Sequence, residues 1–300
     1  MYTRTALVRG FLEKPPHLVS CIFFKLQPKF FRDSSIVDRQ IKQRTPLGIM
    51  KDTVFALFIR ELRTRFGGSR LGYFWAIAEP AGQAALLTAV FSLMGRTSLS
   101  GIDIPVFMVV GLVPFKLFTK LISQLSHSVL SNKGLMAYRQ VEPIDPVITR
   151  LLIELATTAI VFVMLMISMY WFLGYQAAPV SLLGVLVALG LLMAFSIGIA
   201  LILCVLFEYF PDLSKLVNVI MTPMMIVSGV FYSASMVPTQ YWGLLDWNPV
   251  FHCLELIRES YYYGYNPGFA SLSFVAQVTV FTDFIGLLLF VSYRTKLVSP

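Results

Sequence analysis

The sequence predicts an all-α polytopic membrane protein with six membrane-spanning helices. Of its 300 residues, 57% are hydrophobic and only 13% are charged, and the mean hydropathy is +0.73. A soluble domain of this size cannot bury so much apolar surface, whereas lipid can cover it. Six apolar stretches are long enough to cross the roughly 30 Å hydrocarbon core as helices. They lie near residues 72–93, 104–122, 151–172, 180–207, 216–234 and 272–293.

The distribution of lysine and arginine predicts that both termini are cytoplasmic. By our count, 14 of the 24 Lys and Arg residues precede the first span. Alternate loops then carry Lys133, Arg139, Lys215, Arg294 and Lys296, as the positive-inside rule requires. The net charge of +8 therefore fits contact with anionic lipid headgroups, and we expect no nucleic-acid partner.

The first 49 residues form a separate basic arm. Its apolar run at 18–24 is too short to span a membrane, and no small-residue cleavage site follows it. Three interpretations stay open for this arm. It is a disordered tail, a non-native extension ahead of a start at Met50, or an aromatic and basic segment that lies on the inner leaflet.

An amphipathic helix is predicted at 51–66, within an interfacial segment at 50–70 that precedes a transmembrane domain at 71–300. Its apolar positions repeat every four residues, at Val54, Phe58, Leu62 and Phe66. Because a span follows directly, we expect this helix to lie in the membrane interface, with Gly67-Gly68 as a hinge.

Ionisable residues fall inside several predicted spans, where each costs about 2.5 to 3.5 kcal/mol at the bilayer centre on insertion scales. Glu79 precedes Pro80 in the first span, so it either faces a polar interior or hydrogen-bonds a neighbouring span. Lys116 and Lys120 lie one turn apart on the second span. Either they contact an anionic substrate, or this helix leaves the core near Phe118 and the lysines reach the headgroups.

Two further patterns in the spans predict helix packing. Arg150 and Glu154 lie four residues apart at the start of the third span, and we expect an intrahelical ion pair between them. Gly190, Ala194 and Gly198 form a ladder of small residues on the fourth span, which is typical of close helix contact in lipid.

No sequence motif for catalysis or cofactor binding is present. The sequence lacks the Gly-x-x-x-x-Gly-Lys-Ser/Thr loop that holds ATP phosphates, and its three histidines are far apart. It also lacks the paired acids with which a metal-assisted sugar transferase holds a nucleotide diphosphate. We therefore expect no cofactor, no metal and no enzymatic activity in this chain, and a partner must supply the energy for any transport.

Five motifs stand in order along the chain, followed by Glu255 and Arg258. They are Phe58-Ile-Arg-Glu-Leu-Arg-Thr-Arg-Phe66, Arg70-Leu-Gly-Tyr-Phe-Trp-Ala-Ile-Ala-Glu-Pro80, Gly111-Leu-Val-Pro-Phe115, Gly134-Leu-Met-Ala-Tyr-Arg-Gln-Val-Glu-Pro-Ile-Asp145 and Tyr241-Trp-Gly-Leu-Leu-Asp-Trp-Asn-Pro249. Together they resemble the permease subunit of capsular polysaccharide ABC exporters, from about Met50 to the end of the chain.

The resemblance implies a type-2 ABC exporter fold, in which two copies of this subunit form a channel in the bacterial inner membrane. Two soluble ATPase subunits would bind ATP and Mg²⁺ beneath it. The cargo would be lipid-linked capsular polysaccharide, and a periplasmic adaptor and an outer-membrane channel would continue its path. An O-antigen or teichoic-acid-like glycan is the alternative cargo. A membrane-embedded glycolipid transferase is a rival of another class, which the missing acids and histidines disfavour.

The segment at 131–146 is the predicted docking surface for the ATPase. It places apolar side chains beside charges, and we expect a short helix that seats in a groove and passes ATPase motion to the spans. An ordinary solvated loop is the alternative. The candidate coupling residues are Leu135, Met136, Tyr138, Arg139, Glu142 and Asp145.

Aromatic and charged residues are candidates for the polysaccharide path, because aromatic rings stack on sugars without fixing one register. By the resemblance, spans one and five line the channel. Pro238 and Asn248-Pro249 predict a re-entrant pair of short helices at the outer mouth. Lipid contact and helix packing are the alternative role for each aromatic. The candidate path residues are Tyr73, Phe74, Trp75, Glu79, Lys116, Lys120, Phe231, Tyr232, Tyr241, Trp242 and Trp247.

Overall fold

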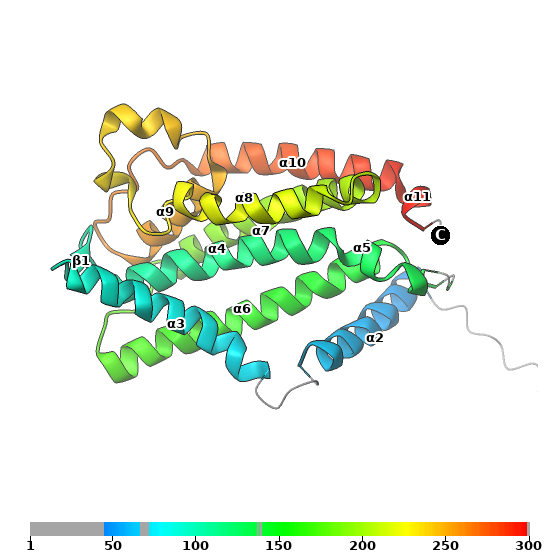
Figure 1. Cartoon of the computed structure of the whole chain (residues 1–300), viewed down its shortest axis with the longest axis horizontal. Coiled ribbons are helices and arrows are strands. Elements are labelled where there is room, and N and C mark those ends of the chain that lie inside the picture. Colours follow the sequence, from blue (N-terminus) through cyan, green and yellow to red (C-terminus); the bar gives the residue numbers. More distant parts are fainter. Residues whose placement is uncertain (1–44, 67–71, 137, 139, 299–300) are drawn as a thin grey trace, which may run out of the picture. The chain divides into compact units, whose positions relative to one another are not determined.

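The computed structural model describes residues 45–66, 72–136, 138 and 140–298 (Figure 1). The basic arm up to residue 44 and the predicted Gly67-Gly68 hinge fall outside this part. Helix α2 (Pro46–Phe66) is the predicted amphipathic helix, and it begins before Met50. Its apolar side chains Val54, Phe58 and Leu62 are half-buried against the rest of the chain.

Five helices in the described part of the chain are long and apolar enough to cross a membrane. They are α3 (Gly72–Leu93), α4 (Ile104–Ser126), α6 (Ile144–Leu173), α7 (Leu182–Tyr209) and α10 (Leu272–Ser292). Large apolar side chains of α3, α6 and α10 are exposed in the single chain. Such surface is stable only when lipid or another subunit covers it, as expected of a polytopic membrane protein.

The fifth predicted span, at 216–234, is wrong in its length. Helix α8 (Leu213–Val227) has 15 residues and is about 22 Å long, which is shorter than the roughly 30 Å hydrocarbon core. It is followed by Gly229, whose φ of +70° stops the helix. A Cβ at Gly229 would lie 2.5 Å from the ring of Phe251, so glycine is also required by the packing.

Helix α4 is the most deeply packed of the spans. In its most apolar stretch 78% of the residues are buried, against 11% for α3 and 22% for α10. A short antiparallel pair of strands, β1 (Ser98–Leu99) and β2 (Ile102–Asp103), precedes it. The helix runs unbroken past the buried Phe118 to Ser126. Because a helix can continue beyond the hydrocarbon core, both roles predicted for Lys116 and Lys120 stay predictions.

Helices α7 and α10 approach closely through small residues. A Cβ at Gly286 would lie 2.6 Å from Gly198 O, and a Cβ at Gly198 would lie 2.5 Å from Asp283 Oδ1. The predicted role of Gly198 in close packing is therefore confirmed. No atom of the described residues lies within 4 Å of a Cβ placed at Gly190, so this member of the predicted ladder is not at a close helix contact within the described chain.

The segment between α8 and α10 folds into short helices. Two 3-10 turns, η2 (Ala234–Met236) and η3 (Thr239–Leu244), precede α9 (Pro249–Tyr261). Helix α9 begins where the Asn248 side chain accepts a hydrogen bond from Val250 N. The predicted break at Asn248-Pro249 is therefore present. At the other end of the spans lie α5 (Ser128–Ser131), η1 (Lys133–Leu135) and α11 (Arg294–Val298).

Candidate functional site

Helix α2 is fixed to the start of α6 by two ion pairs. Arg65 Nη1 donates to Glu154 Oε1 over 2.5 Å, and Arg150 Nε lies 3.3 Å from Glu61 Oε1. Glu154 is only 1% exposed, so Arg65 neutralises a carboxylate that water does not reach. The predicted pair between Arg150 and Glu154 is therefore wrong. Both side chains turn to α2 because Glu61 and Arg65, one turn apart, present the complementary charges.

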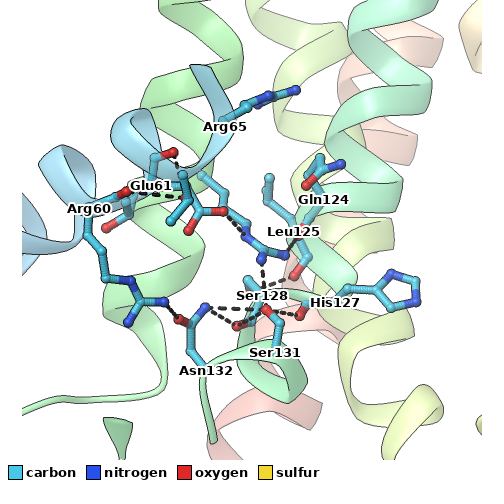
Figure 2. A network of polar contacts seen from close by, with 12 residues as sticks. Arg60, Glu61, Arg65, Gln124, Leu125, His127, Ser128, Ser131 and Asn132 are labelled. Atoms are coloured by element: carbon cyan, nitrogen blue, oxygen red, sulfur yellow. Dashed lines mark hydrogen bonds and ion pairs between the residues drawn. The ribbon is translucent and has the colours of Figure 1, made fainter. Parts of the chain in front are cut away.

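Arg150 also holds the end of α4 and the start of the docking segment. Its Nη1 donates to Gln124 O over 2.8 Å, and its Nη2 donates to Ser131 Oγ over 2.7 Å. Figure 2 shows Arg60 of α2 reaching the same region, where its Nη2 donates to the Oδ1 of Asn132 over 2.8 Å. We call this cluster the α2 junction and define it as Arg60, Glu61, Arg65, Ser131, Asn132, Arg150 and Glu154.

The predicted docking segment at 131–146 is tied to two further helix ends. Lys133 Nζ donates to Glu208 Oε1 at the end of α7 over 2.6 Å. Glu142 Oε1 lies 2.9 Å from Arg294 Nη2 at the start of α11, so this candidate coupling residue has a partner within the chain. Movement of the segment would therefore be transmitted to α2, α7 and α11 through charged contacts.

The candidate coupling residues do not share one exposed surface. Met136 is 5% exposed and Asp145 is 1% exposed, and Asp145 Oδ2 accepts from the backbone N of Glu142. Both therefore stabilise the segment internally in this structure. Tyr138, in contrast, is 67% exposed, while Arg139 lies outside the described residues. The helical part of the segment is the 3-10 turn η1, shorter than the helix we expected.

Tyr138 faces a groove of about 550 Å³ between the docking segment and α2. The half-buried Leu135 lines it from one side, and Leu57 and Arg60 line it from α2. An apolar floor with charged residues at its edge is the kind of surface that accepts a helix of a partner protein. Arg60 connects this groove to the α2 junction, since it lines the groove and donates to Asn132.

Two of the ionisable residues inside the spans form an ion pair. Lys116 Nζ on α4 donates to Glu79 Oε1 on α3 over 2.7 Å. Glu79 therefore hydrogen-bonds a neighbouring span, which was one of its two predicted roles. Lys120, one turn further along α4, is half-buried and also acts electrostatically on the Glu79 carboxylate.

A second polar cluster surrounds the fully buried Arg258 on α9. Its Nη1 donates to Glu255 Oε1 over 2.7 Å and to Tyr232 O over 3.1 Å. Its Nη2 donates to Gly229 O over 2.8 Å and to Val230 O over 3.0 Å. The guanidinium thus holds the chain that follows α8, and it brings this segment onto α9.

Aromatic groups complete the Arg258 cluster. The Arg258 guanidinium lies 3.9 Å from the centre of the Phe107 ring on α4. Tyr265 donates its hydroxyl to Glu255 Oε2 over 2.8 Å. Burial raises the pKa of the Tyr265 phenol, so it stays protonated and able to donate. Sequence motifs indicated Glu255 and Arg258, but they gave no sign of Tyr265 or of Phe107, which is distant in the chain.

The candidate aromatic residues of the path fall into three groups. Exposed aromatics occur on α3 and around η3, and they are Phe74, Trp75, Tyr241 and Trp247. Phe231 and Tyr232 are half-buried. Trp242 has a packing role, since its Nε1 donates to Val237 O over 2.9 Å and its ring contacts Phe269. The side chain of Tyr73 lies outside the described part.

Residues 52–262 match the family described as ABC-2 type transporter, which covers most of the described helices. The chain belongs to this family. Its members are transport components, and within the described residues of this ABC-2 chain no group of three His, Cys, Asp or Glu is placed to hold a metal ion.

Relatives of this ABC-2 chain match over most of their length. It is 37% identical to the polysialic acid transport protein KpsM of Escherichia coli, over 84% of this chain and 96% of the relative. It is 26% identical to the capsule polysaccharide export inner-membrane protein CtrC of Neisseria meningitidis, over 71% of this chain and 80% of the relative. It is 25% identical to the O-antigen export system permease protein RfbA of Klebsiella pneumoniae, over 75% of this chain and 85% of the relative.

Proposed function

We propose that this chain is the membrane permease subunit of an ATP-driven exporter that moves lipid-linked capsular polysaccharide out of the cytoplasm. The observation that carries the proposal is the match to a polysialic acid transport protein over 96% of that relative's length. A match of this extent supports a common architecture for the two proteins. The capsule export relative from Neisseria meningitidis supports the same substrate class.

The energy for transport comes from a partner ATPase that binds ATP and Mg²⁺. Two copies of this chain form the channel, and two ATPase subunits dock on their cytoplasmic side. The exposed Tyr138 and the groove between the docking segment and α2 support this assignment. The salt bridges of the α2 junction, Lys133 and Glu142 then carry ATPase motion into α2, α7 and α11.

The polymer path runs along the weakly buried helices α3 and α8. Few residues of α3 and none of α8 are fully buried in the single chain, so a second copy and the polymer would cover them. Exposed Phe74 and Trp75 offer ring faces for sugars near the start of α3. Tyr241 and Trp247 lie beyond α8, where a periplasmic adaptor and an outer-membrane channel would continue the path.

An O-antigen is the second candidate cargo, since an O-antigen export permease also matches this chain, at 25% identity. The two candidates are separated by complementation. Two bacterial hosts are used, of which one lacks its capsule permease and the other lacks its O-antigen permease. Each host receives this chain together with the ATPase that belongs to this chain. Surface polymer restored only in the capsule host supports the proposal. Restoration only in the O-antigen host would replace capsule polysaccharide by O-antigen as the cargo.

A further inference from the structure

One face of α4 is polar along a helix that is otherwise buried. Between Val106 and Leu125, every α4 side chain that is not fully buried belongs to a polar residue. We call this face the polar stripe, and it consists of Lys116, Thr119, Lys120, Ser123 and Gln124. The spacing of three and four residues places all five on one side of the helix.

One end of the polar stripe borders a groove of about 400 Å³ between α3, α4 and α8. Lys116 and Thr119 line the groove from α4, while Gln83 and Thr222 add polar groups from α3 and α8. Exposure of an amide, two hydroxyls and an ammonium to lipid inside a span would cost free energy. They are stable when they face water or a hydrophilic cargo.

Lys116 lines this groove, and Lys120 lies one turn further along α4, but the two lysines differ in their partners. Glu79 neutralises Lys116 through the 2.7 Å ion pair. Lys120 has no carboxylate within ion-pair distance among the residues that the structure describes, although it is half-buried. Each chain therefore presents one positive charge without an ion-pair partner, on Lys120. The charge on Lys116 is paired with Glu79, and a competing anion can displace that carboxylate.

We propose that the polar stripe is a binding site for the acidic groups of an anionic glycan. Glu79 lowers the affinity of this site, because its carboxylate competes with the glycan for Lys116. The inference rests on the proposed function and adds a charge preference to it. The chemistry that fits is a polymer with a carboxylate on its sugars and hydroxyls between them. Lys120 binds the carboxylates, and Gln83, Thr119 and Thr222 bind the hydroxyls.

The test uses the complete transporter, this chain with its ATPase, in lipid nanodiscs. Fluorescently labelled polysialic acid is titrated against it, together with the same polymer after its carboxylates have been reduced to alcohols. We expect Lys120→Gln to weaken binding of the acidic polymer about fivefold to tenfold and to leave binding of the reduced polymer unchanged. Lys51→Gln makes the same charge change on exposed α2 and should alter neither affinity.

Glu79→Gln gives an effect of the opposite sign, which general damage to the fold would not produce. Freeing Lys116 should strengthen binding of the acidic polymer severalfold, and Lys116→Gln combined with Glu79→Gln should cancel that gain. Binding of the reduced polymer by each variant shows that it is folded.

Two results would overturn the inference. Suppose that wild-type protein binds both polymers and that neither Lys120→Gln nor Glu79→Gln changes the ratio of its affinities for acidic and reduced polymer. The polar stripe then does not bind the acidic groups, whereas the proposed polysaccharide export is unaffected. If wild-type protein binds neither polymer, both the stripe and the proposed substrate class are wrong.

Discussion

The Arg65 guanidinium on α2 donates to the buried Glu154 carboxylate on α6 over 2.5 Å. Arg65 itself is about one third exposed, so the pair joins a surface helix to the interior of the bundle. This contact and the pair between Arg150 and Glu61 hold α2 beside the docking segment. The position of α2 therefore depends on charges as well as on its apolar face.

Removal of Arg65 should loosen α2. Arg65→Met leaves Glu154 buried and unpaired, and we expect a loss of about 1 to 2 kcal/mol of stability, because solvent screens the exposed side of the pair. The readout is the midpoint of thermal unfolding in detergent. Arg63→Met removes an exposed charge from the same helix and should have little effect. Equal losses in the two variants would contradict the role of the pair, and adding Glu154→Gln to Arg65→Met should recover most of the loss.

Gly111 on α4 should not tolerate a methyl group. A Cβ there would lie 2.6 Å from Arg258 Nη2 and 2.9 Å from Val230 O, and the second is a backbone atom that cannot turn away. We expect Gly111→Ala to destabilise the protein by about 1 to 3 kcal/mol. Gly190→Ala, in open space on α7, should be neutral or stabilising by up to about 1 kcal/mol. Thermal unfolding of both variants checks this, and a harmless Gly111→Ala would contradict the packing.

The Arg258 cluster should be required for stability. Arg258→Met leaves Glu255 as an uncompensated buried charge, which costs about 3 to 5 kcal/mol. Tyr265→Phe removes one hydrogen bond and should cost about 1 kcal/mol. Arg96→Met, at an exposed arginine, is the matched control. The yield of folded protein and its unfolding midpoint measure these effects. Similar behaviour of Arg258→Met and Arg96→Met would show that the cluster contributes little.

Tyr138 should contribute to ATPase docking. A large exposed aromatic beside a groove is a typical anchor at an interface, so Tyr138→Ala should weaken the ATPase complex by about 2 kcal/mol, or about thirtyfold in affinity. Tyr263→Ala removes a tyrosine that is also exposed but follows α9. Affinity measured with purified subunits distinguishes the two variants. Unchanged affinity in Tyr138→Ala would remove the docking segment from the interface.

Arg139→Glu tests the same segment through charge. The prediction from the sequence is that the reversal uncouples ATP hydrolysis from export while the two-copy assembly stays intact. Export and ATPase activity are measured on the same preparation. Normal export by this variant would show that docking does not need the positive charge.

Hydropathy and charge were sufficient to find the membrane helices, because about 20 apolar residues have few stable alternatives to a span. They did not find the end of α8. That end depends on the φ of Gly229 and on the Phe251 ring packed against it, a contact between residues that hydropathy treats separately.

The polar contacts were predicted less well, because most of them join residues far apart in the chain. The local rule for residues four apart assigned Glu154 to Arg150, whereas the packing of α2 supplied Arg65 and Glu61 as partners. For the same reason Met136 was taken for an exposed coupling residue although it is buried. Glu79 was placed correctly as a residue in need of a partner, but only the fold identified Lys116.

The most direct test of polysaccharide export is the ratio of surface to intracellular polymer in capsule-producing cells whose own permease is deleted. These cells receive this chain with its ATPase, either active or unable to hydrolyse ATP. We expect surface polymer with the active ATPase and intracellular accumulation with the inactive one. Polymer that stays inside despite a correctly inserted subunit bound to an active ATPase would contradict the account.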